Sequence, residues 1–148
     1  MIKILFICHG NICRSPMAEF IFKHMAEQAG RADDFEVTSA AVSSEETGND
    51  MYPPAKRKLT EKGVPFEHRA ARKMTKADYS YYDHIVCMDK SNLRILQWII
   101  GNDNDNKVTL LMDWVGKNRD VADPWYTGDF ETTYNDLLEG CTALLAGL

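Results

Sequence analysis

The hydrophobic positions of the chain fall into short apolar runs, separated by stretches in which apolar residues recur with helical spacing. The run "IKILFIC" is continuous, which is typical of a strand buried on both faces of a parallel sheet. Three further runs are rich in β-forming residues. The pattern therefore predicts four strands, over Ile2–Cys8, Phe35–Val42, His84–Asp89 and Lys107–Trp114.

Helices are predicted between these strands. Ser15 and Pro16 suit the N-cap and the first helical position, and the helix that follows ends near Gly30. Its apolar positions lie on one face. A helix opens at Pro53 and stops at Gly63, and another covers Asn92–Ile100. The last helix carries one apolar stripe, and the stretch 115–129 before it is predicted to be irregular.

Strands that alternate with helices predict an α/β fold. We expect a single domain over residues 1–148, with a mainly parallel central sheet of about four strands and helices on both faces. In such sheets, ligands bind beyond the carboxyl ends of the strands. Residues 8–15 follow the first strand, so this segment is the predicted binding loop.

Composition restricts the function. The 148 residues carry a net charge of −5, which argues against a nucleic-acid partner because such proteins need a basic face. No apolar run is long enough to span a membrane, and the N-terminal run is too short for a secretion signal. The four cysteines are few and unevenly spaced, unlike a disulfide framework. We expect a cytoplasmic protein without a membrane partner.

The predicted binding loop combines residues that suit attack on an anion. Cys8 and Arg14 are separated by five residues, directly before a helix. Amides at a helix N-terminus attract anions, and Arg14 can bind two phosphate oxygens at once. Gly10 permits a tight turn, and Asn11 tolerates a left-handed backbone. A cysteine in this field loses its proton readily, so Cys8 is a candidate nucleophile that Ser15 can hydrogen-bond.

The loop also admits other interpretations. Cys8 could be a buried structural thiol at the end of a strand. Cys8 and Cys13 have C-x4-C spacing with no second pair, which makes a zinc site improbable. A Walker loop requires a lysine pattern that is absent. The string "CHGNICRSP" between a strand and a helix favours the catalytic interpretation.

Cleavage of a phosphate ester also needs a proton donor. The candidate is Asp123 in "DPWYTGD", beside the aromatic residues Trp125 and Tyr126. A carboxyl group near an apolar wall and a bound phosphate keeps its proton longer than in water, which suits a general acid. Taken alone, this segment also fits a surface turn. Asp120 and Asp129 are nearby alternatives.

The two motifs together resemble the low-molecular-weight protein tyrosine phosphatase family. "CHGNICRSPMAE" is similar to the active-site loop of that family and "ADPWYTGDF" to its acid loop, while "VTSAAVS" and "CMDKSNL" resemble family segments in the same order. The resemblance implies that Cys8 is the nucleophile and forms a phosphocysteine. It also implies that Arg14 binds phosphate and that Asp123 is the general acid and then the general base.

The resemblance also implies roles for the surrounding residues. A hydrogen-bond network that holds the loop would include Asn11, Ser15, Ser39 and His68, although "HRAAR" is one residue longer than usual in the family. Cys13 would be able to form a disulfide with Cys8, which would make the site redox-sensitive. No cofactor or metal is implied. The residues expected to contact substrate or phosphate are His9, Gly10, Asn11, Ile12, Cys13, Ser15, Trp125 and Tyr126.

The expected partners are phosphotyrosine-containing proteins, among which a tyrosine kinase is one candidate, and the chain is expected to be a monomer. Three alternative functions remain. Protein arginine phosphatases resemble this loop but favour threonine where Ile12 stands and lack the aromatic pair. Arsenate reductases need a further close cysteine pair, which Cys87 does not have. A non-catalytic module would bind phosphorylated ligands without turnover, and the intact catalytic set argues against it.

Overall fold

A four-stranded sheet forms the centre of the molecule. The computed structural model describes all 148 residues. The strands run parallel in the order β2-β1-β3-β4, which confirms the predicted α/β class. Their bounds are β1 (Ile2–Cys8), β2 (Phe35–Ala41), β3 (His84–Cys87) and β4 (Val108–Leu110).

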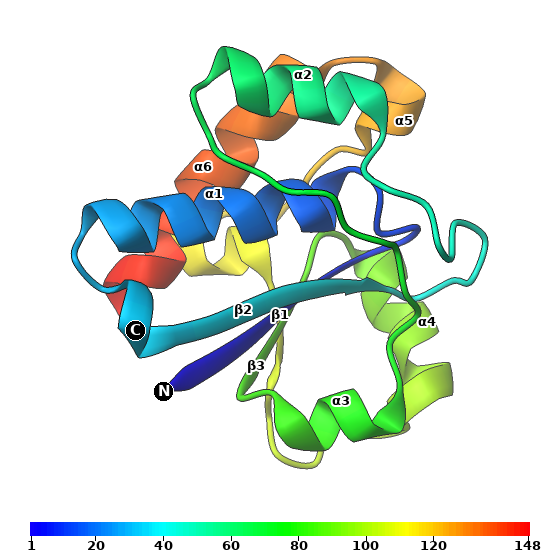
Figure 1. Cartoon of the computed structure of the whole chain (residues 1–148). Helices are drawn as coiled ribbons and strands as arrows, with labels where there is room; N and C mark the ends of the chain where they lie inside the picture. Colours follow the sequence, from blue (N-terminus) through cyan, green and yellow to red (C-terminus); the bar gives the residue numbers. More distant parts are fainter.

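Helices cover both faces of this sheet, as Figure 1 shows. Alternate side chains of β1 point to opposite faces. Ile4 and Phe6 belong to a core beneath α1 (Arg14–Gln28) and α6 (Phe130–Gly147). Leu5 and Ile7 belong to a second core beneath α3 (Lys76–Tyr81) and α4 (Lys90–Ile100). Strand β1 is therefore buried on both sides, which explains its continuous apolar sequence.

The order in which the strands are added to the sheet creates a binding crevice. From β1 it passes through α1 to β2 on one side, and it later returns to β3 on the other side of β1. The carboxyl ends of β1 and β3 flank the point where this order reverses, which is where α/β sheets bind ligands. Cys8 ends β1, and Asp89 lies two residues beyond β3.

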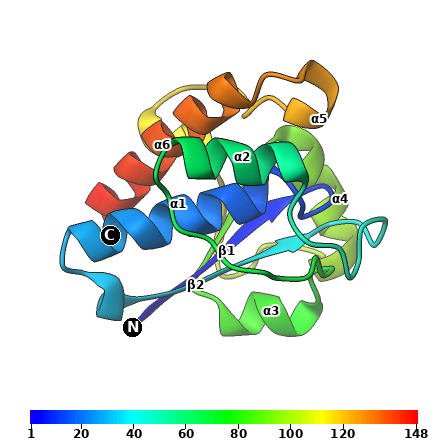
Figure 2. The ribbon, with the colours of Figure 1, turned by 45° about the horizontal axis from the view of Figure 1, so that its top comes forward.

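The start of α2 (Pro53–Glu61) lies beside the short helix α5 (Pro124–Thr127), which Figures 1 and 2 both show. The ring of Tyr52, which precedes α2, packs on Trp125 of α5 with 4.8 Å between ring centroids. This contact places α5 above the carboxyl end of β1. The segment 115–129 was predicted to be irregular, so α5 is an addition to the prediction.

The other differences between prediction and structure are shifted element ends and two short helices. The last strand stops at Leu110, and Leu111–Val115 form the 3-10 helix η2, where the sequence predicted a strand to Trp114. Leu111 packs so closely on Gly140 that a side chain there would lie 2.4 Å from its Cγ. Packing under α6 thus bends this apolar run out of the sheet. Helix α3 and the 3-10 helix η1 (Ala32–Asp34) were not predicted.

Helix α1 begins two residues earlier than predicted. Cys13 occupies its N-cap position, and no side chain caps the first turn. Ser15 was the predicted cap, but its hydroxyl contacts the thiol of Cys8 instead. Ser15 does not cap the helix, because it lies within the first turn and its side chain faces the binding loop.

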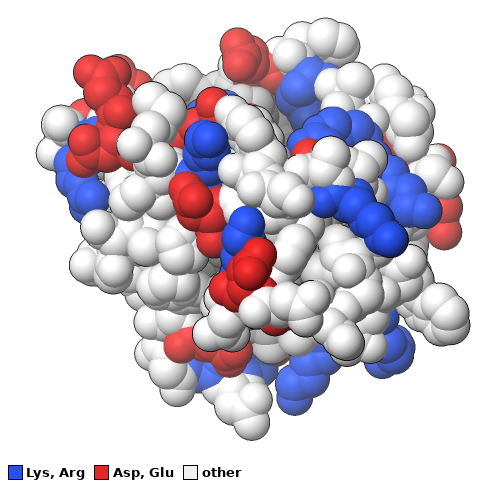
Figure 3. All heavy atoms as spheres, turned by 90° about the horizontal axis from the view of Figure 1, so that it is seen from below, with Lys and Arg blue, Asp and Glu red and all other residues white.

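The surface carries charges of both signs. Figure 3 shows the face below the sheet, where acidic and basic side chains lie next to each other and neither sign covers the face. None of the helices combines the length and the apolar character that crossing a membrane requires.

Candidate active site

The loop between β1 and α1 is arranged around the sulfur of Cys8. Asn11 has a left-handed backbone, with φ of 60°, as its residue type allows. This conformation brings the backbone N–H of Asn11 to 3.3 Å from Cys8 Sγ. The hydroxyl of Ser15 lies 3.0 Å from the same sulfur. Two groups able to donate hydrogen bonds therefore converge on one buried thiol.

Arg14 projects from the first turn of α1 and is almost fully buried, with 2% of its side chain exposed. Its Nη1 donates to Asp89 Oδ2 at 2.8 Å and to the carbonyl of Val121 at 2.8 Å. Burial by itself would lower the pKa of Arg14, but the negative charges of Cys8, Asp89 and Asp123 raise it. The guanidinium is thus a fixed, permanent cation next to the thiol.

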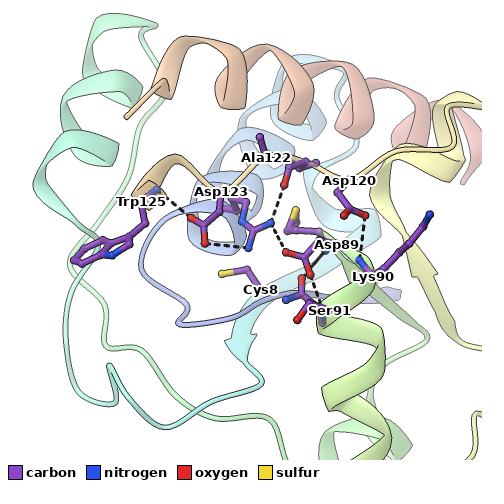
Figure 4. Close-up of polar contacts among 12 residues, drawn as sticks. Cys8, Asp89, Lys90, Ser91, Asp120, Ala122, Asp123 and Trp125 are labelled. Carbon is purple, nitrogen blue, oxygen red and sulfur yellow. Dashed lines mark hydrogen bonds and ion pairs between the residues drawn. The ribbon is translucent and has the colours of Figure 1, made fainter. Parts of the chain in front are cut away.

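Asp123 also contacts this guanidinium, and Figure 4 shows its side chain together with those of Cys8 and Asp89. It is the N-cap of α5, and its Oδ1 accepts a hydrogen bond from the backbone N–H of Trp125 at 3.0 Å. Its Oδ2 lies 3.5 Å from Arg14 Nη2. The two alternative acids are engaged elsewhere: Asp120 accepts from the backbone of Lys90, and Asp129 caps α6.

A pocket opens above these groups. Its mouth is partly aromatic, since Trp125 is 51% exposed and Tyr126 is 84% exposed. Tyr52 supports the Trp125 ring from behind. A flat aryl group that enters would meet apolar walls and a charged floor. The lining residues are Cys8, His9, Gly10, Ile12, Cys13, Arg14, Glu45, Glu46, Asp123, Trp125 and Tyr126.

Part of the pocket lining is acidic. His9 Nε2 lies 3.3 Å from Glu45 Oε2, so this histidine is partnered by a carboxylate. A side chain on Gly10 would lie 3.3 Å from Glu46 Cγ. Gly10 does not have a positive φ; it allows the acidic segment to approach the loop closely. Glu45 and Glu46 both line the pocket.

A buried network lies behind the loop. Asn11 Nδ2 donates to Ser15 Oγ at 2.8 Å and to Ser39 Oγ at 3.0 Å. Ser39 Oγ in turn donates to Glu19 Oε1 at 2.7 Å. The structure thus brings together the residues Asn11, Ser15 and Ser39 that the family resemblance implied, and it adds Glu19.

His68 does not join this network. Its side chain is 86% exposed and its Nδ1 lies 2.9 Å from Asp50 Oδ2. The guanidinium of Arg69 donates to Asn11 Oδ1 instead. Neighbouring side chains in an extended segment point to opposite sides, and here His68 faces solvent while Arg69 faces the loop. The inner position of this segment is therefore held by an arginine.

Cys13 lines the pocket but differs chemically from Cys8. Burial raises the pKa of Cys13 well above that of a free thiol, and the negative charges of Cys8 and Asp123 raise it further. It is therefore a neutral thiol at physiological pH. All four cysteines of the chain are free, so Cys8 and Cys13 are not joined by a disulfide in this structure.

Asp89, Glu19 and Arg69 are site residues that the sequence analysis did not identify. For Asp89 a signal existed, because it is the last residue of a predicted strand and the carboxyl ends of parallel strands meet at one edge of the sheet. Glu19 lies on a predicted helix among apolar residues, and Arg69 lies in an irregular segment. Neither position has a local pattern that indicates its contact.

Comparisons with known proteins agree with this geometry. The family described as "Low molecular weight phosphotyrosine protein phosphatase" matches residues 3–148. The low molecular weight protein-tyrosine-phosphatase YfkJ of Bacillus subtilis is 36% identical over 150 residues, covering 100% of this chain and 96% of that protein. The human low molecular weight phosphotyrosine protein phosphatase is 36% identical over 153 residues, covering 97% and 93%.

Solved structures show the same relationship. The crystal structure of YfkJ superposes with a TM-score of 0.95 over 99% of this chain and 94% of that one. A Drosophila arginine phosphatase also has this fold, with a TM-score of 0.89 and 30% identity over 99% and 97% of the two chains. The family match covers almost the whole sequence and includes both loops that form the pocket. The chain belongs to the low molecular weight phosphotyrosine protein phosphatase family.

Proposed function

We propose that this protein is a protein tyrosine phosphatase, and that residues 1–148 act as one catalytic domain. The observation that carries the proposal is the convergence of three groups on one pocket: the thiol of Cys8, the buried guanidinium of Arg14 and the carboxyl of Asp123. They come from β1, α1 and the start of α5. Such a set supplies a nucleophile, a clamp for phosphate oxygens and a proton donor.

In the first step, the Cys8 thiolate attacks phosphorus in line with the bond to the tyrosine oxygen. The S–P bond forms as the P–O bond to tyrosine breaks. Asp123 gives its proton to the leaving oxygen, so tyrosine departs neutral. Arg14 and the loop amides hold the charge on the other phosphate oxygens, and this positioning supplies most of the rate enhancement.

In the second step, water attacks the phosphocysteine. The carboxylate of Asp123 now takes a proton from that water, the new P–O bond forms, and the S–P bond breaks. Inorganic phosphate leaves and the thiolate of Cys8 is regenerated. The hydroxyl of Ser15, 3.0 Å from the sulfur, and the amide of Asn11 stabilise the departing thiolate by hydrogen bonding.

The aromatic wall supports tyrosine as the substrate side chain. Ile12, Trp125 and Tyr126 line the pocket, and these surfaces suit a phenyl ring. Arginine phosphatase is the second candidate, because a structural neighbour bears that name. The exposed aromatic pair favours tyrosine over arginine, although cation–π contact with a guanidino group is also available to such rings.

The physiological substrates would be phosphotyrosine-containing proteins, with a tyrosine kinase as one candidate. We propose that the protein acts as a monomer in the cytoplasm. The four free thiols support a reducing compartment.

The decisive experiment compares phosphate release from a phosphotyrosine peptide and a phosphoarginine peptide of the same flanking sequence, with EDTA present. Faster release from phosphotyrosine is expected. Faster release from phosphoarginine would transfer the proposal to the second candidate, with the same roles for Cys8 and Arg14.

The variant C8S is the matched control for the nucleophile. It is expected to lose turnover while it still binds a phosphate analogue such as vanadate, because the loop amides and Arg14 remain in place. If C8S turned over at the wild-type rate, Cys8 would not be the nucleophile.

A further inference from the structure

The side-chain amide of Asn11 is the junction of the hydrogen bonds behind the loop. Its Nδ2 donates to the hydroxyls of Ser15 and Ser39. Its Oδ1 accepts from the guanidinium of Arg69 and, at 3.3 Å, from the backbone N–H of Arg72. An amide that was turned over would direct its NH₂ group at these two donors, so the donors fix which way it points.

The direction of this amide decides what Ser15 can do. Because Asn11 Nδ2 donates to Ser15 Oγ, that oxygen is already an acceptor. The single hydroxyl proton of Ser15 is then free to point at Cys8 Sγ, 3.0 Å away. Ser39 is polarised in the same sense, since it accepts from Asn11 and donates to Glu19. The network therefore presents a donor to the sulfur, which favours the thiolate.

Arg69 also contacts residues 45–50, the rim segment, which carries the acidic part of the pocket lining. Its Nη1 donates to the backbone carbonyl of Asn49 at 3.4 Å, and its own backbone N–H donates to Asp50 Oδ1 at 3.3 Å. The side chain is half-buried between this segment and the binding loop. One guanidinium thus joins two loops that line the pocket and are about 40 residues apart in the sequence.

An arginine is suited to this position because it has five N–H donors and no acceptor. Partial burial lowers the pKa of Arg69, against the raising effect of the negative charges of Glu19, Asp50 and Cys8. An arginine stays protonated in proteins throughout the working pH range. The polarity that it imposes on Asn11 is therefore independent of pH, whereas a histidine can change its donor pattern.

We propose that Arg69 is a positioning residue for catalysis: it orients the Asn11 amide, and through Ser15 it directs a hydrogen-bond donor at Cys8, while it holds the rim segment against the same loop. This inference rests on the proposed function, since it assigns Arg69 a role in the thiolate chemistry of that site. It corrects the assignment of His68, which the family resemblance implied for this place.

The test uses four forms of the full chain: wild type, R69M, R69K and the surface control R57M. Arg57 is an exposed arginine on α2 outside the pocket. Methionine has a similar length to arginine but no donor, and lysine keeps a cationic donor. Two quantities are measured: kcat and KM on a phosphotyrosine peptide, and the rate at which iodoacetate alkylates Cys8 at neutral pH, with the modified residue identified by mass spectrometry.

The expected loss in R69M is about tenfold in kcat, because one charged hydrogen bond is removed while the Arg72 amide still partly orients Asn11. The alkylation rate is expected to fall in parallel, R69K to lie between R69M and wild type, and R57M to match wild type. Asn11→Gly keeps the left-handed backbone and removes the amide. In that background R69M should have a much smaller effect on kcat, because the path through Asn11 is already lost and only the contact of Arg69 with Asn49 remains to be removed.

Two results would overturn the proposal. One is a folded R69M with kcat and alkylation rate equal to those of wild type. The other is an R69M effect that is fully retained in the Asn11→Gly background. If R69M does not fold, R69Q replaces it, with the same expected order and the same contrary results. A wild-type protein that releases no phosphate from the peptide would refute the proposed function, and the alkylation rates would still decide the role of Arg69.

Discussion

The carboxylate of Asp89 offers the sharpest test of how this site is assembled. Asp89 Oδ2 accepts from Arg14 Nη1 at 2.8 Å, and Asp89 Oδ1 accepts from the backbone N–H of Asn92 at 2.7 Å as the N-cap of α4. Asparagine is an equally good N-cap. The substitution Asp89→Asn therefore removes the charge opposite Arg14 while it preserves the cap and the side-chain volume.

The expected magnitude follows from burial. Two unit charges about 4 Å apart attract by about 4 kcal/mol at an effective dielectric constant of 20. A neutral amide oxygen recovers about 1 kcal/mol of this as an ordinary hydrogen bond. We therefore expect Asp89→Asn to lower the free energy of unfolding by about 2–3 kcal/mol. For a chain of this length that corresponds to a fall in Tm of about 5–10 °C.

The catalytic effect should be of about the same size as the effect on stability. Without Asp89, the buried guanidinium of Arg14 is left with Asp123 as its one carboxylate partner, at 3.5 Å. A tighter pair would draw Arg14 toward Asp123 and away from the position in which it binds phosphate oxygens. We expect kcat/KM to fall by about a hundredfold, which corresponds to about 2.7 kcal/mol of lost transition-state stabilisation.

The assay combines thermal unfolding by circular dichroism with steady-state kinetics on a phosphotyrosine peptide. Asp120→Asn is the matched control, because Asp120 also binds an amide at the start of α4 but is exposed and does not contact Arg14. The control should stay within about 0.5 kcal/mol of wild type. The reasoning is refuted if Asp89→Asn matches the control in both measurements.

Three further predictions concern the pocket rim and the loop. Burial would raise the pKa of Asp50, but hydrogen bonds from Lys56 and from backbone amides hold this pKa well below its usual range. Urea titrations at pH 7 should therefore show that Asp50→Asn is less stable than wild type. The difference in the free energy of unfolding should become smaller as the pH falls below about 4, because Asp50 then takes up a proton. A difference that does not change with pH would contradict the lowered pKa of Asp50. Cys13→Ser should keep the wild-type kcat, because the Cys13 thiol is neutral. After peroxide treatment, however, only the wild type should recover activity with dithiothreitol. Equal recovery of both forms would exclude a protective disulfide between Cys8 and Cys13. Glu46→Gln removes a negative charge from the pocket that a phosphate dianion enters. The kcat/KM should therefore rise about threefold at low salt and less at high salt. An increase that does not depend on salt would indicate a steric cause.

The local features of this site could be predicted from the sequence because they are encoded within a few residues. A strand, a turn and a helix start occupy only residues 2–16, so the spacing of Cys8 and Arg14 already places both at one loop. The left-handed backbone of Asn11 follows from residue type alone. The alternation of strands and helices likewise led to the parallel sheet, because apolar periodicity records burial directly.

Asp123 is an intermediate case. Its sequence surroundings fit an ordinary turn as well as an acid loop, and only the family resemblance separated the two. The structure places it in the pocket because α5 packs against Tyr52 and faces the buried Arg14. A one-turn helix has too little periodicity to be predicted from hydrophobic pattern, since it buries only Pro124.

Other features depended on the tertiary structure alone. The partners Asp89 and Arg69 lie 75 residues from Arg14 and 58 residues from Asn11, and a hydrogen bond leaves no periodic signal at either end. The choice of Arg69 over His68 depended on which side chain of an extended segment faces inward, and the apolar run after Leu110 left the sheet because α6 covers it. By itself, the sequence determined the strand, the loop and the nucleophile, because their geometry is local. Folding decided how the charges around the nucleophile are paired and oriented, because those contacts exist only once distant segments are packed together.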